Sequence, residues 1–429
     1  MAVAYLPDSG NDGYTALAYD LDLTYRVATN RLDGTATIRL RALADLQRFS
    51  LDLVRLRASK VRVDGTKAAR FTQSAAKLVV TPASAIEAGE EFVATIEYGG
   101  SPAPRSSTWG ALGWEELTDG VIVASQPSGA PTWFPCNDDP ADKASYRIAI
   151  STEQSYAVVC NGTLASRRTR SGRTTWVYEQ QEPTSTYLAT VQIGRYELVP
   201  ATFAEVPGVL AGPPALRSRI AHDFGRVGEM MACFEDAYGP YPFPSYSVVV
   251  TEDDLEIPLE AQGMAIFGAN HADGHDAAER LVAHELAHQW FGNSVGVASW
   301  SEIWLNEGFA CYSEWVWSEA SGRTSAARLA AETHARLKGL PQDIIVGDPG
   351  ARAMFDDRVY KRGALTLAAL RARIGDDAFF RVLREWTARH RHGVVTTEDF
   401  VGLCVEVSGI RELPALFDDW LTRRPLPAL

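Results

Sequence analysis

The stretch LVAHELAHQWF (281–291) contains the residues whose types and spacing point most directly to chemistry. His284 and His288 are four positions apart, so on a helix both imidazoles project from one face, one turn apart. Two neutral ring nitrogens placed in this way can reach one Zn²⁺ at about 2.0–2.1 Å. Glu285 lies on an adjacent face, close to such a metal but not aimed at it as a ligand, where it can take a proton from water. The spacing predicts a zinc-dependent hydrolytic site.

A third ligand is available in the next helical pattern, WLNEGFA (304–310). A catalytic zinc takes three protein ligands and keeps one position open, and a carboxylate completes a set with two histidines. Glu307 lies nineteen residues after His288, and the loop GNSVGVASW (292–300) can join two antiparallel helices. The alternatives are two core-facing histidines on an amphipathic helix and a solvated helix glutamate. The three residues together favour the metal site.

Composition and charge exclude several classes of protein. The chain has 429 residues, of which 46% are hydrophobic and 22% charged, a balance typical of folded cores and not of disordered, collagen-like or coiled-coil chains. With 41 Lys+Arg against 54 Asp+Glu, the net charge of −13 argues against binding to nucleic acid or to an anionic membrane surface. No apolar run reaches the ~18 residues that a membrane-spanning helix needs.

Cysteine usage and the N-terminus bear on the cellular compartment. The five cysteines are scattered and form no CxxC pair, so neither a disulfide framework nor a thiolate zinc site is expected. The N-terminal MAVAYLPDSGNDGY has neither a basic segment nor a sustained apolar core, and we therefore expect no signal peptide. The expected compartment is the cytoplasm, although a processed or leaderless secreted chain would look the same.

The first half of the chain has the pattern of β-structure. Apolar and polar residues alternate, as in half-buried strands, at 21–27, 35–43, 49–54 and 91–98. Strand and turn patterns continue to about residues 186–200, and no helical pattern of three turns competes with them. Residues 1–197 are therefore predicted to form a sandwich-like all-β domain.

The second half is mostly helical. After the Pro/Gly-rich stretch 206–219, helical periodicity appears at 220–239, 277–291, 304–320, 360–374 and 376–390, with one strand pattern at 245–254. Residues 198–429 are therefore predicted to form a mostly helical α+β domain. The predicted fold class is multi-domain, a β domain followed by an α+β domain.

The segments HELAHQWFGNSV and WLNEGFACY resemble the aminopeptidase-N-like family of zinc metallopeptidases, which are gluzincins. The resemblance extends upstream to residues 126–146 and downstream to 359–371, and so covers almost the whole chain. It implies a saddle-like N-terminal β domain on a thermolysin-like catalytic domain, and one Zn²⁺ per chain. Many members of the family continue into further domains, so this chain resembles a short two-domain member.

The resemblance implies a substrate-binding residue in IPLEAQGMAIF. Glu260 aligns with the glutamate of the family's GAMEN signature, which binds the free α-amine of the substrate. A carboxylate at a fixed distance from zinc selects the terminal residue because it pairs only with a terminal ammonium. The other signature positions differ here and are Ile257, Pro258, Leu259 and Ala261. The alternative for Glu260 is a solvated acid of this acidic loop.

Two further residues are implied by the resemblance. Tyr360 in VYKRG aligns with the family tyrosine that donates its phenol to the oxyanion, which lowers the barrier selectively. Gln126 aligns with a family glutamine near the first side chain of the substrate, and Ser128 stands where the family often has an acid. The alternative for Tyr360 is a helix tyrosine at the edge of the core, and the alternative for Gln126 is a buried strand amide.

Other polar and aromatic residues carry weaker predictions. Glu302 is interpreted either as support for a metal-binding histidine or as a solvated loop acid. His390 and His392, in the basic run RHRH, are predicted to be exposed. The aromatic residues around the predicted metal helices are predicted to belong to the core and are Trp290, Phe291, Trp300 and Trp304.

These observations predict a zinc-dependent aminopeptidase that hydrolyses the N-terminal peptide bond of peptides with a free N-terminus. Zinc is expected on His284, His288 and Glu307, with Glu285 as the base and Tyr360 as the oxyanion donor. We expect a monomer, with neither nucleic acid nor membrane as a partner. An endopeptidase and a zinc-stabilised binding module are the alternatives, whereas the epoxide hydrolase activity of one family branch is not expected because the helical domain that helps to form that site is missing.

Overall fold

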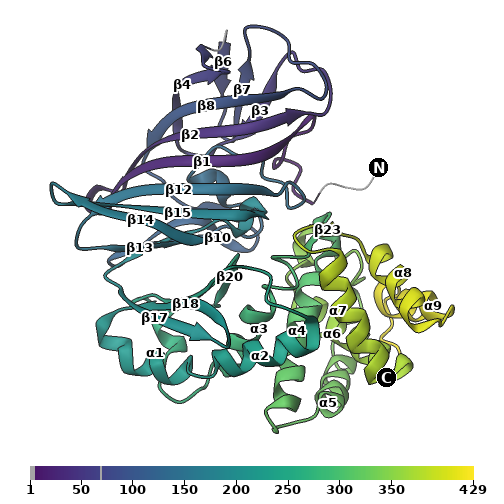
Figure 1. Ribbon diagram of the computed structural model, residues 1–429. Coiled ribbons are helices and arrows are strands. Elements are labelled where there is room, and N and C mark those ends of the chain that lie inside the picture. The colour runs from purple at the N-terminus through teal and green to yellow at the C-terminus, as the bar shows by residue number, and fades with distance from the viewer. Residues whose placement is uncertain (1–4, 68–69) are drawn as a thin grey trace.

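A computed structural model of the chain describes residues 5–67 and 70–429. The first half of the chain forms a β-rich part and the second half forms a mostly helical part (Figure 1). This order is the predicted one. The prediction that the N-terminus is no signal peptide falls partly on residues 1–4, which lie outside the described residues.

The β-rich part combines one large sheet with two smaller ones. Its strands are β1 (Tyr14–Arg26), β2 (Arg31–Ala42), β3 (Phe49–Asp52), β4 (Arg57–Val63), β5 (Thr66–Lys67), β6 (Arg70–Gln73), β7 (Lys77–Thr81), β8 (Glu91–Gly100), β9 (Arg105–Ser107), β10 (Gly110–Leu117), β11 (Gly120–Ala124), β12 (Ala144–Glu153), β13 (Ala157–Cys160), β14 (Thr163–Arg170), β15 (Arg173–Thr184) and β16 (Val191–Gly194). The large sheet has the order β14-β15-β12-β1-β2-β8-β4-β5, and the smaller ones have the orders β13-β16-β11-β10-β9 and β3-β7-β6.

The alternating pattern of the sequence reflects burial on one face of these strands. Leu21 and Leu23 of β1 and Ile38 of β2 are buried in one core together with Leu51 and Val123 of the smaller sheets. Because side chains alternate between the two faces of a strand, every second position of β1 and β2 meets this core. Strands β1 and β12 are parallel neighbours in the large sheet, with Ala18 opposite Ser145.

The helical part is built around one mixed sheet. Its strands are β17 (Glu197–Phe203), β18 (Val206–Gly212), β19 (Tyr246–Val250), β20 (Leu259–Ala261) and β21 (Met264–Phe267), in the order β17-β18-β19-β21-β20, and the short β22 (Gly296–Val297) pairs with β23 (Val394–Val395). Its helices are α1 (Arg217–Asp223), α2 (Val227–Tyr238), α3 (Glu279–Ala287), α4 (Trp304–Ala320), α5 (Ala326–Lys338), α6 (Asp357–Ile374), α7 (Asp376–Arg389), α8 (Thr397–Ser408) and α9 (Leu413–Phe417). Helix α4 packs against both α3 and α6. Within the described ranges, no helix is long and apolar enough to span a bilayer.

Two features of the second half differ from the predicted elements. The Pro/Gly-rich stretch 206–219 is not only a change of pattern, because it forms β18, which pairs with β17 and β19. The single helical pattern 220–239 is divided into α1 and α2, and the Asp223 side chain at the end of α1 accepts hydrogen bonds from the backbone of Gly274 and Asp276. A domain division at residue 197 stays a prediction. Glu197 begins β17, the first strand of the mixed sheet in the helical part.

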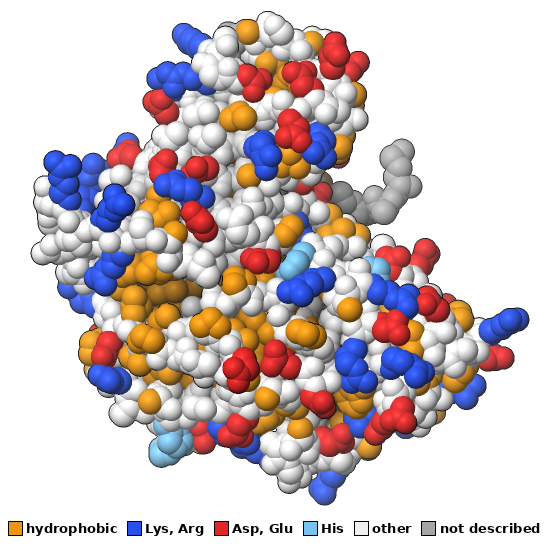
Figure 2. Space-filling model, in the orientation of Figure 1, with side chains coloured by type: hydrophobic (Ala, Val, Ile, Leu, Met, Phe, Trp, Pro, Cys, Tyr) orange, Lys and Arg blue, Asp and Glu red, His pale blue; other side chains and the backbone are white. Residues whose placement is uncertain are grey.

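Polar contacts join the two parts close to the end of α3. The Lys143 ammonium, just before β12, donates to the backbone oxygens of Asn293 (2.9 Å) and Ser294 (2.8 Å). The Asn161 side chain donates to the backbone oxygen of Gln262 (2.9 Å). On the face shown in Figure 2, hydrophobic side chains gather in a hollow between the two parts. A buried apolar cluster at the junction contains Ile122, Val159, Ala211, Val249, Ala261, Met264 and Ile266.

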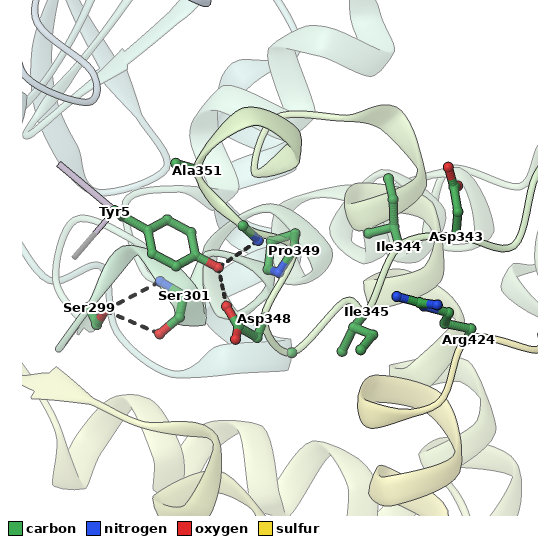
Figure 3. Close-up of a pocket in the computed structure, with 12 residues that line it drawn as sticks. Tyr5, Ser299, Ser301, Asp343, Ile344, Ile345, Asp348, Pro349, Ala351 and Arg424 are labelled. Carbon is green, nitrogen blue, oxygen red and sulfur yellow. Dashed lines mark hydrogen bonds between the residues drawn. The ribbon is translucent and has the colours of Figure 1, made fainter. Parts of the chain in front are cut away.

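The N-terminal end of the described chain lies against the helical part, at a cavity of about 560 Å³ (Figure 3). The hydroxyl of Tyr5 donates to Asp348 (2.5 Å) and accepts from the backbone amide of Gly350 (2.8 Å). Ser299 and Arg424 also line this cavity, which does not contain the predicted metal ligands.

Candidate active site

The three predicted metal ligands converge between α3 and α4. The Nε2 atom of His284 lies 3.6 Å from Oε2 of Glu307, and the Nε2 atom of His288 lies 3.4 Å from the same oxygen. All three side chains are buried. Two donor atoms at about 2.0–2.1 Å from a tetrahedral zinc lie about 3.3–3.4 Å apart, so these separations fit one Zn²⁺.

The far side of each imidazole is held by a hydrogen bond. His284 donates from Nδ1 to Oε1 of Glu314 (2.8 Å), and His288 donates from Nδ1 to the backbone oxygen of Phe291 (3.1 Å). These bonds leave both Nε2 atoms facing Glu307, as hydrogen bonds to the outer nitrogen of metal-binding histidines do. Glu314 was not among the residues predicted from the sequence. It could have been found from its position seven residues after Glu307, two turns along the same face of α4.

Glu302, one of whose interpretations was support for a metal-binding histidine, does not contact either histidine. Its Oε2 accepts from the backbone amide of Thr397 (3.1 Å) and from the Thr397 hydroxyl. The carboxylate therefore satisfies the first turn of α8, where backbone N–H groups lack partners within the helix. Glu302 therefore stabilises the start of α8, which is distant in the sequence but packs beside it.

The charges in the site favour a bound cation. Burial acts to raise the pKa of Glu307, but the positive charge of His288 and the close imidazole of His284 lower it to about 2. Burial acts to lower the pKa of His284, whereas the neighbouring carboxylates of Glu307 and Glu314 raise it to about 9. For His288 the charges of Glu307 and Glu260 overcome burial and raise the pKa to about 10. Carboxylates that stabilise imidazolium at this position also stabilise a metal cation.

Glu285 is buried beside the ligands and has unused hydrogen-bonding capacity. Burial raises its pKa to about 7, with a further contribution from Glu260 and an opposing one from the two histidines. Among the described residues, its Oε2 has no hydrogen-bond partner. A buried carboxylate oxygen without a partner fits a group that exchanges a proton with water or substrate.

The β-rich part contributes to the site through Gln126. Its Nε2 donates to Oε1 of Glu260 on β20 (2.6 Å), so the structure brings the two predicted substrate-binding residues together. Glu260 also approaches Glu285 and His288, since one ligand atom from each lies within 4.8 Å of the others. Burial raises the pKa of Glu260, against the charge of His288. The neighbouring Ser128 is buried and carries no charge.

Tyr360, on α6, completes the cluster. Its ring stacks against the imidazole of His284 with a centroid distance of 6.2 Å and an interplanar angle of 15°. Burial and the charges of Glu307, Glu260 and Glu285 raise the pKa of its phenol well above the ordinary value. The phenol therefore remains protonated and can donate a hydrogen bond.

The remaining predictions have mixed outcomes. The aromatic residues around the metal helices are buried core residues, as predicted; they are Trp290, Phe291, Trp300 and Trp304. The prediction that His390 and His392 are exposed is wrong, because both are half-buried. The His390 ring lies 4.5 Å from that of Trp386, and the His392 ring lies 5.5 Å from that of Phe243. Burial lowers the pKa of His392 to about 4.

Comparison with known families identifies the two parts. The Peptidase family M1 domain matches residues 223–420, and the Peptidase M1 N-terminal domain matches residues 15–188. The chain belongs to the peptidase M1 family. This membership confirms the resemblance seen in the two motifs that carry His284, His288 and Glu307.

Several M1-family relatives show how far the similarity extends. An M1 zinc metallopeptidase from Deinococcus radiodurans, a mutant solved with a Tyr-Ser-Ala substrate, is 29% identical and superposes with a TM-score of 0.91, covering 100% of this chain and 99% of that one. A leucyl aminopeptidase of Saccharolobus solfataricus is 23% identical over 432 residues, which are 95% of this chain and 53% of the relative. Human endoplasmic reticulum aminopeptidase 1 is 30% identical over 302 residues, which are 65% of this chain and 32% of the relative. The chain thus spans about half the length, or less, of these curated relatives.

Proposed function

We propose that this M1-family chain is a zinc-dependent aminopeptidase that hydrolyses the first peptide bond of peptides with a free N-terminus. The observation that carries the proposal is the position of a further acid, the half-buried Glu260, which lies beside His288 of the ligand set His284, His288 and Glu307. The ligand set fits zinc, and Glu260 fits a terminal ammonium. M1 zinc metallopeptidases of the same two-domain fold have been solved with a tripeptide, with L-arginine and with L-tryptophan, which supports a peptide substrate here.

The reaction follows from the groups around the ligand set. His284, His288 and Glu307 would hold the zinc, which would supply Lewis-acid chemistry to the scissile carbonyl and to water. Glu285 takes the proton of the attacking water on its partnerless Oε2 and later delivers it to the leaving amine. Tyr360 donates its phenol proton in a hydrogen bond to the carbonyl oxygen as negative charge develops there.

Glu260 sets which bond is cleaved. Gln126 occupies one of its carboxylate oxygens and orients the group, so that the other oxygen can accept from a substrate ammonium. Because a peptide carries this ammonium only at its first residue, the carbonyl held near the zinc is that of the first peptide bond. Ser128 offers no second charge for the amine.

An endopeptidase is the second candidate, and the altered GAMEN signature together with Ser128 favours it. Two peptides that differ only in N-acetylation separate the candidates when each is given to the zinc-loaded protein. We expect cleavage of the free-amine peptide and a loss of about 2–5 kcal/mol of transition-state stabilisation for it in Glu260→Ala. Glu256→Ala, which removes an exposed acid of the same loop, is the control. Equal cleavage of both peptides, unchanged in Glu260→Ala, would establish the endopeptidase instead.

The proposed partners are peptide substrates with a free N-terminus, and the proposed form is a monomer in the cytoplasm. All five cysteines are free, and four of them are buried, an arrangement that suits a reducing compartment.

A further inference from the structure

The hairpin that carries Glu260 is too short to fix its own position. Strand β20 has three residues at the edge of its sheet, and a two-residue turn, Gln262 and Gly263, joins it to β21. Gly263 has φ +73°, which favours glycine in this turn. Among the strands of the described chain, only β21 pairs with β20 along the backbone, so side chains from elsewhere must hold its other edge.

One buried side chain just after α3 binds three backbone groups of this hairpin. The Oε1 atom of Gln289 accepts from the amide of Gly263 (2.8 Å), and its Nε2 donates to the backbone oxygens of Ala261 (3.1 Å) and Met264 (3.4 Å). Gln289 is fully buried, with 0% of its surface exposed. It therefore satisfies hairpin groups that would otherwise be buried without partners.

Gln289 is also the next residue after a metal ligand. His288 directs its Nε2 toward Glu307, and the following side chain reaches the strand that contains Glu260. Consecutive Cα atoms are about 3.8 Å apart across one planar peptide unit, so little flexibility separates the ligand from the hairpin. A single rigid peptide unit, between His288 and Gln289, therefore connects the predicted metal site to the hairpin that carries Glu260.

Asn293 and Lys143 reinforce this link. The Asn293 side chain donates to the same Ala261 oxygen (3.0 Å), while its backbone amide donates to the backbone oxygen of His288 (3.0 Å). Lys143 holds the Asn293 backbone from the β-rich part. The segment after α3 is therefore braced against both the hairpin and the other part of the molecule.

We propose that Gln289 is a positioning residue that sets the distance from the zinc site to the amine-binding Glu260, and thereby limits cleavage to the first peptide bond. This inference rests on the proposed aminopeptidase function. A substrate held by its ammonium presents its first carbonyl to the metal only when the two sites keep their separation. A displaced hairpin still binds the amine but holds the carbonyl in the wrong place.

The test compares Gln289→Leu with Gln192→Leu, both loaded with zinc. The control removes a buried glutamine of the β-rich part, which donates to Thr190 and the Val123 backbone, and so matches the loss of a buried amide. Each variant is measured for zinc content, melting temperature and kcat/KM on the free-amine and N-acetylated peptides. Calorimetry gives the Kd of L-arginine and of N-acetyl-L-arginine, a readout that needs no turnover.

In Gln289→Leu we expect a fall on the order of 10²-fold in the preference for the free-amine peptide, mainly in kcat, with full zinc content. Affinity for L-arginine should weaken, because its ammonium and its carboxylate can no longer reach Glu260 and the zinc site at the same time, while affinity for the acetylated compound stays the same. A merely structural loss lowers the active fraction and so affects both substrates equally, as expected for Gln192→Leu. If Gln289→Leu does not fold, Gln289→Met fills the same space without the amide.

The double variant Gln289→Leu/Glu260→Ala separates this inference from the proposed function. If Gln289 acts through Glu260, the preference in the double variant should be no lower than in Glu260→Ala alone. Additive losses, or an unchanged preference in a folded Gln289 variant, overturn the positioning of Glu260 by Gln289. If the proposed function is wrong, the wild-type protein itself shows no preference for the free-amine peptide over the N-acetylated one.

Discussion

Glu314→Gln tests how strongly zinc affinity depends on the carboxylate behind His284. Glu314 is buried, with 5% of its surface exposed, and its Oε1 accepts from Nδ1 of His284 (2.8 Å) and from Nη1 of Arg280 (2.9 Å). Glutamine keeps the volume and an acceptor oxygen but removes the charge. The imidazole then becomes a weaker electron donor to a metal on its opposite nitrogen.

The expected magnitude follows from this single contact. Loss of an outer partner of a metal-binding histidine weakens metal affinity by about 10–100-fold, which is about 1.4–2.7 kcal/mol. The loss should remain near this range because His288 and Glu307 keep their own contacts, and because Arg280 is largely exposed and can be solvated.

Competition with a chromophoric zinc chelator at fixed pH measures this effect. The matched control is Glu302→Gln, because sequence reasoning offered Glu302 as a support for a metal-binding histidine and the structure places it against α8. We expect Glu302→Gln to lower the melting temperature and to leave the zinc Kd unchanged. A wild-type zinc Kd in Glu314→Gln, or a weakened one in Glu302→Gln, would refute the reasoning.

Further predictions concern the reacting groups and one buried acid. Glu285→Ala should retain zinc by metal analysis and lose most turnover, because it removes the base; loss of zinc would make Glu285 a ligand. Glu307→Ala should lose metal affinity, and zinc binding equal to wild type would contradict its assignment as a ligand. Tyr360→Phe should lower kcat by about 10²–10³ with little change in KM, and an unchanged kcat would place Tyr360 in the core only. Burial and the charge of Asp52 raise the pKa of Asp138 to about 8, so the folded state binds the extra proton and the stability from this group is lost as pH rises toward 8. Asp138→Asn should therefore melt increasingly above wild type from pH 5 to pH 8, and parallel melting profiles would refute the shift.

The features that the sequence determined are those that depend on local geometry. His284 and His288 must share a face wherever the segment is helical, because the helical period is a property of the backbone. The alternation along β1 and β2 likewise predicts their buried faces before any partner strand is known. The spacing of these residues and the helical patterns on both sides of the loop therefore sufficed to predict that His284, His288 and Glu307 lie close together, and to predict the order of the elements.

Tertiary structure alone decided which distant residues meet. Gln126 and Glu260 are 134 residues apart and pair across the two parts of the molecule, and no local period encodes that contact. Of the two acids on or near α4, packing turned Glu314 toward His284 and gave Glu302 to the start of α8. In the sequence, nothing distinguishes Gln289 from an ordinary helix glutamine. Its hydrogen bonds to the hairpin backbone are decided by tertiary structure alone, because a hydrogen bond is directional and its partners are placed by the packing of several elements.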